Sequence, residues 1–151
     1  VHQALDNLET HFPEFKGKGY QIAGFGWHQG YNDMLSTQAD EGYEQNLVDF
    51  IRDIRAELGK PKLPFSIATT GHGGMKVTPE QRRTLAGQLN VADPKKHPEF
   101  AGNVFTIDSR PFQYSVEQSP KSDGSHWNYN GKTLYLIGKG MGDGMVEMLK
   151  R

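Results

Sequence analysis

Three short segments of this 151-residue chain are apolar on both sides of an extended backbone, which limits the folds open to it. They are residues 20–25, 65–70 and 104–107, rich in β-branched and aromatic side chains. Strands of this kind are typical of parallel sheets, because helices cover both faces of such a sheet. Stretches of helical periodicity separate them. The pattern therefore predicts βαβ units and an α/β fold, a doubly wound parallel sheet with about three strands.

The helices expected between these strands carry signals at their ends. One is predicted to begin with Asp40 as its N-cap and to present an apolar stripe over residues 43–58, where Gly59 ends it. Another begins at residues 78–81 (Thr-Pro-Glu-Gln), a capping box with proline in the first helical position. The last helix is predicted over residues 129–150.

The last helix contains four glycines at alternate positions, and this spacing has two interpretations. A phosphate-binding loop is disfavoured, because no Gly-Lys-Ser/Thr follows and no strand leads into the glycines. Each helical glycine costs about 1 kcal/mol relative to alanine, so something must offset that cost. Close approach of the helix to the sheet is the preferred explanation of Gly138, Gly140, Gly142 and Gly144.

Composition removes several classes of protein. A formal net charge of -1 gives no global field that would favour nucleic acid or an anionic membrane. The absence of cysteine excludes disulfides, thiolate metal sites and a cysteine nucleophile. No apolar run approaches the ~20 residues of a membrane span, and the N-terminus has no signal-peptide pattern. The chain begins at Val1 and enters a helical pattern at once, which predicts an entry partway into a domain.

Polar side chains follow each predicted strand at the point where it ends. The first strand leads into residues 26–33, the second into residues 70–74, and the third into Asp108 and a long loop that contains Asp123 and His126. In open α/β sheets, ligands bind beyond the carboxyl ends of the strands. The sequence therefore predicts one site at this edge of the sheet.

Two of these segments have the chemistry of acyl transfer. An aspartate three residues ahead of a histidine, as in Asp123 and His126, can hold one imidazole nitrogen while the other faces a substrate. The turn of residues 30–33 (Gly-Tyr-Asn-Asp) can present the amide of Asn32 to an oxyanion. No serine lies in a Gly-x-Ser-x-Gly or Gly-Asp-Ser turn. The chain thus contains most of an esterase site without its nucleophile.

The same segments resemble a known family. Residues 27–33 (Trp-His-Gln-Gly-Tyr-Asn-Asp) are similar to the Trp-x-Gln-Gly-Glu-x-Asp block of the sialate O-acetylesterase-like carbohydrate esterases, a branch of the SGNH hydrolases. Residues 123–130, followed by Leu-Ile-Gly at 136–138, resemble the closing Asp-x-x-His block and final helix of that family. The resemblance extends over nearly the whole chain, strongly at these two blocks and loosely between them.

The resemblance implies a role for each candidate residue. His126 would be the general base and Asp123 its orienting carboxylate. The oxyanion-hole donors would be Asn32, Gln29 and Gly30. A substrate rim would comprise Trp27, Tyr31, His72 and Trp127, with Tyr31 in the position where the family usually has Glu. No cofactor is implied, and no metal is expected, because the histidines lack the spacing of metal ligands on a helix.

Each assignment has a structural alternative. Asp123 can cap a turn at residues 122–124, and Asn32 can hold the tight turn in which it lies. Gln29 can hydrogen-bond the backbone of its own loop, and His126 can be an exposed loop histidine. For the two tryptophans, packing in the core or at the rim explains the residues as well as stacking on a sugar does.

The leading hypothesis is that residues 1–151 are the C-terminal part of a single SGNH-type esterase domain that deacetylates a carbohydrate. Its serine would lie upstream of Val1, so this chain alone is expected to be inactive. The alternative is a non-catalytic carbohydrate-binding module that keeps the esterase fold. The expected partners are an acetylated carbohydrate and the N-terminal part of the same protein, or a second copy paired through the edge of strand 20–25. The resemblance favours a secreted or periplasmic location.

Overall fold

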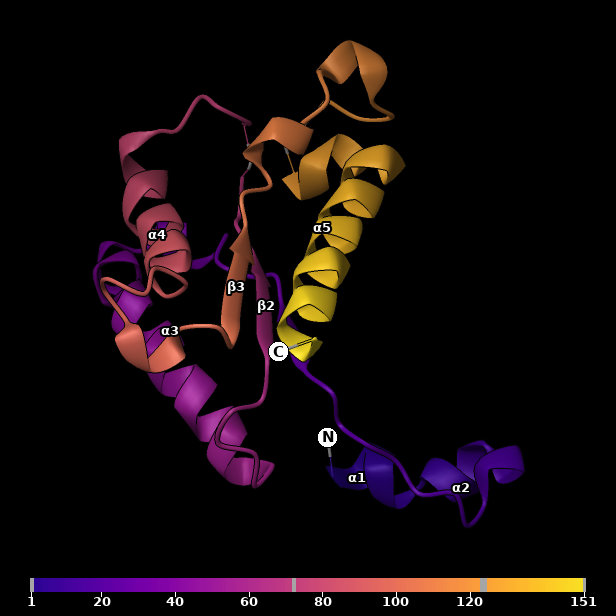
Figure 1. Cartoon of the computed structure of the whole chain (residues 1–151). Coiled ribbons are helices and arrows are strands. Elements are labelled where there is room, and N and C mark those ends of the chain that lie inside the picture. Colours follow the sequence, from indigo (N-terminus) through magenta and orange to yellow (C-terminus); the bar gives the residue numbers. More distant parts are fainter. Residues whose placement is uncertain (1, 72, 123–124, 151) are drawn as a thin grey trace.

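A computed structural model describes residues 2–71, 73–122 and 125–150, and its centre is an open sheet of three parallel strands (Figure 1). The strands are β1 (Phe25–Trp27), β2 (Phe65–Ala68) and β3 (Val104–Ile107), with β2 in the middle. In the register of the sheet, Phe25 is opposite Phe65, which in turn is opposite Val104. The α/β class predicted from the sequence is confirmed.

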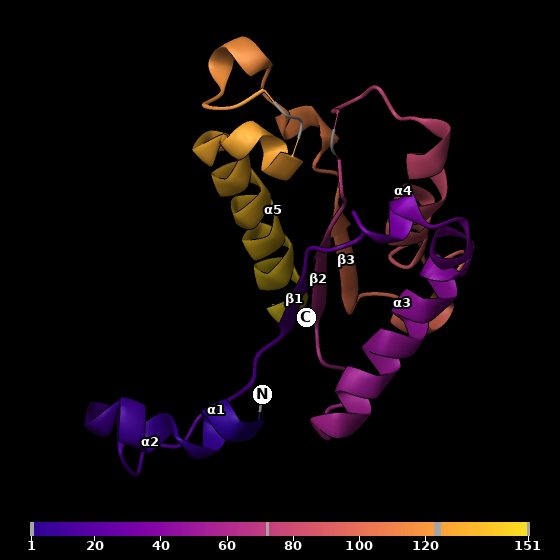
Figure 2. The same cartoon turned by 180° about the vertical axis from the view of Figure 1, so that it is seen from behind.

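Helices cover both faces of this sheet (Figures 1 and 2). On one face lie α3 (Thr37–Glu57) and α4 (Pro79–Asn90), and on the other lies α5 (Gly131–Leu149). The short helices α1 (His2–Asp6) and α2 (Leu8–His11) lie away from the sheet at the N-terminal end of the chain. None of the described helices is long and apolar enough to cross a bilayer.

Short 3₁₀ helices occupy many of the connections. Their bounds are η1 (Pro13–Phe15), η2 (Asp33–Leu35), η3 (Pro98–Phe100), η4 (Arg110–Phe112), η5 (Val116–Gln118) and η6 (Ser125–Tyr129). Two of them lie at the segments that the sequence predicted to form the site: η2 follows the loop after β1, and η6 comes just before α5.

The first strand is shorter than its apolar sequence predicted. The prediction placed it at residues 20–25, whereas β1 runs from Phe25 to Trp27 and Tyr20 is 57% exposed. The reason lies in the neighbouring strand, where Pro64 precedes Phe65. Proline has no N–H to donate, so it cannot extend the ladder on that side. The carbonyl of Pro64 still accepts a hydrogen bond from Phe25 N at 2.8 Å, and the pairing begins there.

The start of α3 also differs from the prediction. The N-cap is Ser36, whose hydroxyl accepts from Ala39 N, rather than Asp40. Asp40 is 6% exposed, and its Oδ1 accepts hydrogen bonds from the backbone N and the Oγ1 of Thr84, both at 2.8 Å. A buried carboxylate requires such donors. Asp40 therefore ties α3 to α4 instead of capping a helix.

The other two helix starts show one confirmation and one shift. At α4 the capping box is present, with Thr78 N donating to Gln81 Oε1 at 3.1 Å. At α5 the helix begins at Gly131 instead of residue 129, because Asn130 is the N-cap. Its Oδ1 accepts from Lys132 N at 3.0 Å and from Thr133 N at 3.1 Å.

The apolar core consists of two clusters, one on each face of the sheet. The larger lies between the sheet, α3 and the segment after α4, and comprises Tyr43, Leu47, Val48, Ile51, Leu63, Phe65, Ile67, Val91, Phe100 and Val104. The smaller lies beneath α5 and comprises Ala68, Trp127 and Ile137. The smaller cluster includes a residue of η6, so packing under α5 also fixes the turn before it.

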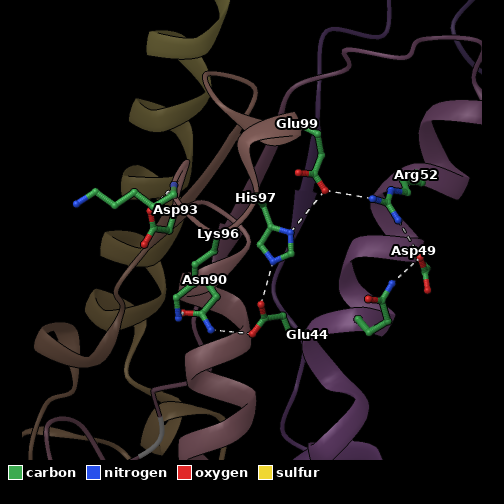
Figure 3. A network of polar contacts seen from close by, with 10 residues as sticks. Glu44, Asp49, Arg52, Asn90, Asp93, Lys96, His97 and Glu99 are labelled. Atoms are coloured by element: carbon green, nitrogen blue, oxygen red, sulfur yellow. Dashed lines mark hydrogen bonds and ion pairs between the residues drawn. The ribbon is translucent and has the colours of Figure 1, made fainter.

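A polar network joins α3, α4 and the segment after α4 (Figure 3). His97 Nε2 lies 2.9 Å from Glu44 Oε1, and Asn90 Nδ2 donates to Glu44 Oε2 at 2.7 Å. Glu99 pairs with Arg52 at 3.1 Å. Burial alone would raise the pKa of Glu44, but the hydrogen bonds from His97 and Asn90 outweigh it and lower that pKa. The network holds the two helices together independently of the apolar core.

Of the four alternating glycines in α5, at positions 138, 140, 142 and 144, two face the sheet. A Cβ on Gly140 would lie 2.9 Å from Ile107 Cγ1, and a Cβ on Gly144 would overlap the ring of Phe105. The other two have open space around the position of a Cβ. Close packing therefore explains Gly140 and Gly144, and it does not explain the remaining pair.

Alanine substitutions separate the two kinds of glycine. We expect Gly144→Ala to lower the free energy of unfolding by about 1–3 kcal/mol, because the added methyl must displace Phe105. Gly142→Ala, the matched control in open space, should raise it by about 1 kcal/mol through helix propensity. Denaturant unfolding of the two variants under identical conditions measures the difference in their free energies of unfolding. Equal effects would contradict the packing of α5 described above.

Candidate active site

The carboxyl ends of β1 and β2 meet the turn η6 at a cavity of about 520 Å³. Its lining residues are His28, Gln29, Gly30, Tyr31, Asn32, Thr70, His126, Trp127, Tyr129 and Leu134. Another cavity, of about 490 Å³, lies beside Arg55 and Phe100, so volume alone does not single out a site. Chemistry does, because this cavity brings the predicted base His126 and the predicted oxyanion donor Asn32 into one place.

The loop after β1 requires glycine at position 30. Gly30 is buried with φ of 149°, a region that favours glycine. A Cβ there would lie 2.7 Å from Gln88 Nε2 and 2.9 Å from Thr84 Cγ2. The loop therefore lies directly against α4, with no room for a side chain between them.

The two amides of this loop have different surroundings. Gln29 Nε2 donates to Asp33 Oδ2 at 2.7 Å, so this amide is engaged within its own loop, through a side chain rather than through the backbone contact that the structural alternative named. Asn32 is exposed and lines the cavity, and its side chain makes no hydrogen bond to the described part of the chain. Of the two, Asn32 is thus the amide that is available to a ligand.

The end of β2 supplies a second wall. Thr70 is buried, and its N–H and hydroxyl both donate to Gln88 Oε1, at 2.9 and 3.2 Å. At Gly71, a Cβ would lie 2.7 Å from Trp127 Cη2 and 2.9 Å from Arg110 N. The missing side chain at Gly71 therefore lets the indole of Trp127 pack against the end of the strand.

An ion pair closes the end of β3. Arg110 donates to Asp108 through Nε at 2.8 Å and through Nη2 at 2.6 Å. The Arg110 hydrogen bonds hold the pKa of Asp108 below its usual range, and the carboxylate raises the pKa of Arg110. Because both of its oxygens are engaged, Asp108 is held within its own loop.

The turn η6 has an unusual backbone. His126, Trp127, Asn128 and Tyr129 all have positive φ, between 45° and 58°. Residues other than glycine pay roughly 1–2 kcal/mol each in this region. Burial of Trp127, which is 2% exposed, offsets part of that cost, and Lys121 N donates to the carbonyl of Asn128 at 3.2 Å. Strain of this kind concentrates at functional sites, and here it presents an exposed His126 to the cavity.

His28 joins the cavity although the sequence reasoning left it out of the site. The residue is exposed at its edge, yet its imidazole lies among protein atoms, with its ring centroid 6.2 Å from that of Trp127. This desolvation lowers the pKa of His28, against a smaller opposing effect of a hydrogen bond with the backbone of Thr69. The neutral imidazole is thereby favoured. Its position in the loop after β1 was the signal that could have identified it.

The remaining predicted residues lie in three kinds of place. Tyr31 is 45% exposed and lines the cavity, and the buried Trp127 also lines the cavity. Trp27 packs against Phe50 in the core, with ring centroids 4.5 Å apart, and is not among the cavity-lining residues of the described chain. Asp123 and His72 lie outside the described residues, so the pairing of Asp123 with His126 stays a prediction.

Metal ligation finds no support in the described part of the chain. No group of three or more His, Asp or Glu side chains within residues 2–71, 73–122 and 125–150 could hold a metal ion.

Comparison with known proteins gives a family and a fold. The family model described as carbohydrate esterase, sialic acid-specific acetylesterase, matches residues 4–143. A crystal structure of a protein from Arabidopsis thaliana shares the fold, with a TM-score of 0.59 at 20% identity. The match covers 97% of this chain and 51% of the Arabidopsis chain, so this chain spans about half the length of that protein. No curated protein matches the chain.

The strained turn predicts an unusual order of stability for two variants. His126→Gly and His126→Ala both remove the imidazole, but only glycine relieves the positive φ of 45°. We expect His126→Gly to be more stable than His126→Ala by about 1 kcal/mol in denaturant unfolding. At Asp53, an exposed position within α3, the order should reverse, because glycine weakens a right-handed helix. The same order at both positions would contradict the left-handed turn.

Proposed function

Because the chain belongs to the carbohydrate esterase family of sialic acid-specific acetylesterases, we propose that it is part of a serine-type carbohydrate O-acetylesterase. In this proposal, the chain supplies the general base and the oxyanion hole of an SGNH-type site. The observation that carries it is the shared cavity of His126 and Asn32 at the carboxyl end of a parallel sheet. Acyl transfer requires these two groups to face one reacting carbonyl.

The proposed reaction has two halves. A serine hydroxyl attacks the acetyl carbonyl while His126 takes its proton, and Asp123 orients the imidazole. The amide of Asn32 and backbone N–H groups stabilise the oxyanion. His126 then protonates the departing sugar oxygen, which leaves an acetyl-serine. In the second half, His126 takes a proton from water, and the resulting hydroxide attacks the acetyl-serine. His126 then returns the proton to the serine oxygen as its bond to the acetyl carbon breaks, which restores the serine and releases acetic acid, ionised to acetate at neutral pH.

The walls of the cavity suit a carbohydrate. Tyr31 and Tyr129 are each 45% exposed, and the buried Trp127 lies between the strand ends and the turn. Pockets for small ligands combine aromatic walls with a few placed polar groups, and the polar groups here are Asn32 and His126. We assign the aromatic side chains to the sugar and the polar ones to its acetyl ester.

We assign the missing serine to an N-terminal part of the same protein. Within the described residues, β1 pairs with β2 alone, so its other edge faces no strand. Unpaired edges recruit other strands. The match to only 51% of the Arabidopsis chain is consistent with a further segment that pairs there and carries the nucleophile. A second copy of this chain could occupy the same edge.

One observation favours a second candidate, a carbohydrate-binding module without catalysis. No serine is among the described residues that line the cavity. Such a module would use the same aromatic walls and would bind its sugar without releasing acetate. The two candidates differ in turnover by the protein extended upstream of Val1, which the module hypothesis predicts to be absent.

Activity assays distinguish these candidates. We expect the isolated chain to be inert toward acetyl esters and the N-terminally extended protein to be active. His126→Ala in the extended protein should lower kcat/KM by at least about 10³-fold, because the general base is lost. His11→Ala, an exposed histidine on α2, is the matched control and should retain activity. Turnover by the isolated 151 residues would place the nucleophile within this chain.

Light scattering tests the proposed partner. The isolated chain should self-associate, whereas addition of the N-terminal part, joined or as a separate chain, should give a defined particle of the combined mass. The physical reason is the unpaired edge of β1, which both partners would cover. A cooperatively unfolding monomer of 16.9 kDa would show that residues 1–151 form a complete domain.

A further inference from the structure

One fully buried amide connects the two walls of the cavity. Gln88 on α4 is 0% exposed and does not itself line the cavity. Its Nε2 donates to the carbonyl of Gln29 at 2.8 Å and to Tyr43 Oη at 3.1 Å. Its Oε1 accepts from the N–H of Thr70 at 2.9 Å and from Thr70 Oγ1 at 3.2 Å. The side chain thus joins the loop after β1 to the end of β2.

The partners fix the orientation of this amide. The N–H of Thr70 can only donate, and the carbonyl of Gln29 can only accept. A flipped amide would place donor against donor and acceptor against acceptor, so one orientation is possible. Tyr43 completes the arrangement, since its hydroxyl donates to the same carbonyl of Gln29 at 2.7 Å. Burial raises the pKa of Tyr43, which keeps that hydroxyl protonated and able to donate.

The amide of Gln88 sets how far the loop after β1 lies from α4. Gly30 follows the bound carbonyl of Gln29, and the Cβ that it lacks would lie 2.7 Å from Gln88 Nε2. Asn32 lies two residues further on, so its place depends on this contact. Thr70 on the opposite wall is bound through both of its donors. Loss of the Gln88 amide would therefore remove the contact that the two walls share.

Other contacts hold α4 in place without Gln88. The carboxylate of Asp40 binds the N–H and hydroxyl of Thr84, and Asn90 binds Glu44 as Figure 3 shows. These contacts lie on both sides of Gln88 along the helix. Loss of the Gln88 amide should therefore free the two loops while the helix itself remains in position.

From these contacts we propose that Gln88 is a positioning residue of the esterase site, which holds Asn32 at the distance from His126 that oxyanion binding requires. The effect of Gln88 on turnover rests on the function proposed above, whereas its effect on the two loops does not. A residue with only a structural role would change stability and leave turnover by the folded protein unchanged. Misplacement of a catalytic group by about 1 Å can cost about 10²-fold in rate.

Two variants of the N-terminally extended protein test this. Gln88→Leu removes every hydrogen bond of this side chain and should lower kcat by about 10- to 100-fold at all pH values, with a smaller change in KM. Gln88→Glu keeps the acceptor for Thr70 but, when ionised, has no donor for the carbonyl of Gln29. Burial raises the pKa of such a carboxyl group, and the protonated form restores a donor. Its kcat relative to wild type should therefore recover as the pH falls.

The matched control is Asn90→Leu, a polar residue two positions along the same helix that contacts α3 but not the cavity. It should retain kcat within about twofold under the same conditions. If both Gln88 variants keep wild-type kcat while only their unfolding midpoints fall, Gln88 is a structural residue and the proposal is wrong. If Gln88→Leu does not fold, the pH-dependent recovery of Gln88→Glu decides the question alone.

A second readout separates this proposal from the proposed function. In amide NMR spectra of the Gln88→Glu protein, Gly30 and Thr70 should shift with the titration of the introduced carboxyl group, while Asn46 on the outer side of α3 should not. If the extended wild-type protein releases no acetate but these shifts appear, the esterase function fails and the positioning of the loops stands. If the shifts are absent, the positioning role is wrong whatever the activity.

Discussion

The carboxyl end of β2 is the constraint on which the rest of the site depends. Thr69 and Thr70 are buried there, and buried polar groups must find hydrogen-bond partners. Thr69 binds Ser109 after β3 through its hydroxyl at 2.9 Å, and Thr70 binds Gln88 on α4. The next residue, Gly71, has no side chain, and this lets Trp127 of the turn η6 pack against it. One short segment thus sets the place of three others, which explains how loops distant in sequence form one cavity.

The strained turn beside the cavity is held in place by buried packing. The four residues of positive φ from His126 to Tyr129 are unfavourable by themselves, and the buried indole of Trp127 holds them. That indole fits because Gly71 has no Cβ, and the loop opposite fits because Gly30 has none. A Cβ at Gly71 would collide with Trp127, and a Cβ at Gly30 would collide with Gln88. The close contacts at these two glycines therefore fix the conformation of the loops around the cavity, although their sequence is polar and lacks long regular elements.

Local patterns predicted the fold, and long-range contacts account for what they missed. Strand 104–107 and the capping box of α4 were predicted correctly, because their signals lie within a few residues. The beginning of β1 was wrong, because it depends on Pro64, about forty residues further along the chain. Asp40 looked like a helix cap and instead binds Thr84 across two helices. The site loops were found from strand ends and motifs, whereas Gln88 carried no signal, since a glutamine on a helix reads as an ordinary polar residue.

The described sheet has two outer edges, one on β1 and one on β3, and the cavity lies beside the edge of β1. This position links the pairing of the sheet to the function of the site. The loop that carries Asn32 begins directly at the end of β1, so a strand that pairs in parallel with β1 would end next to that loop. Parallel strands bring their carboxyl ends to the same edge of a sheet. A segment that covers the edge would therefore also deliver its own terminal residues to the cavity. In the proposed esterase, the pairing that completes the sheet is the same event that would bring the serine to His126.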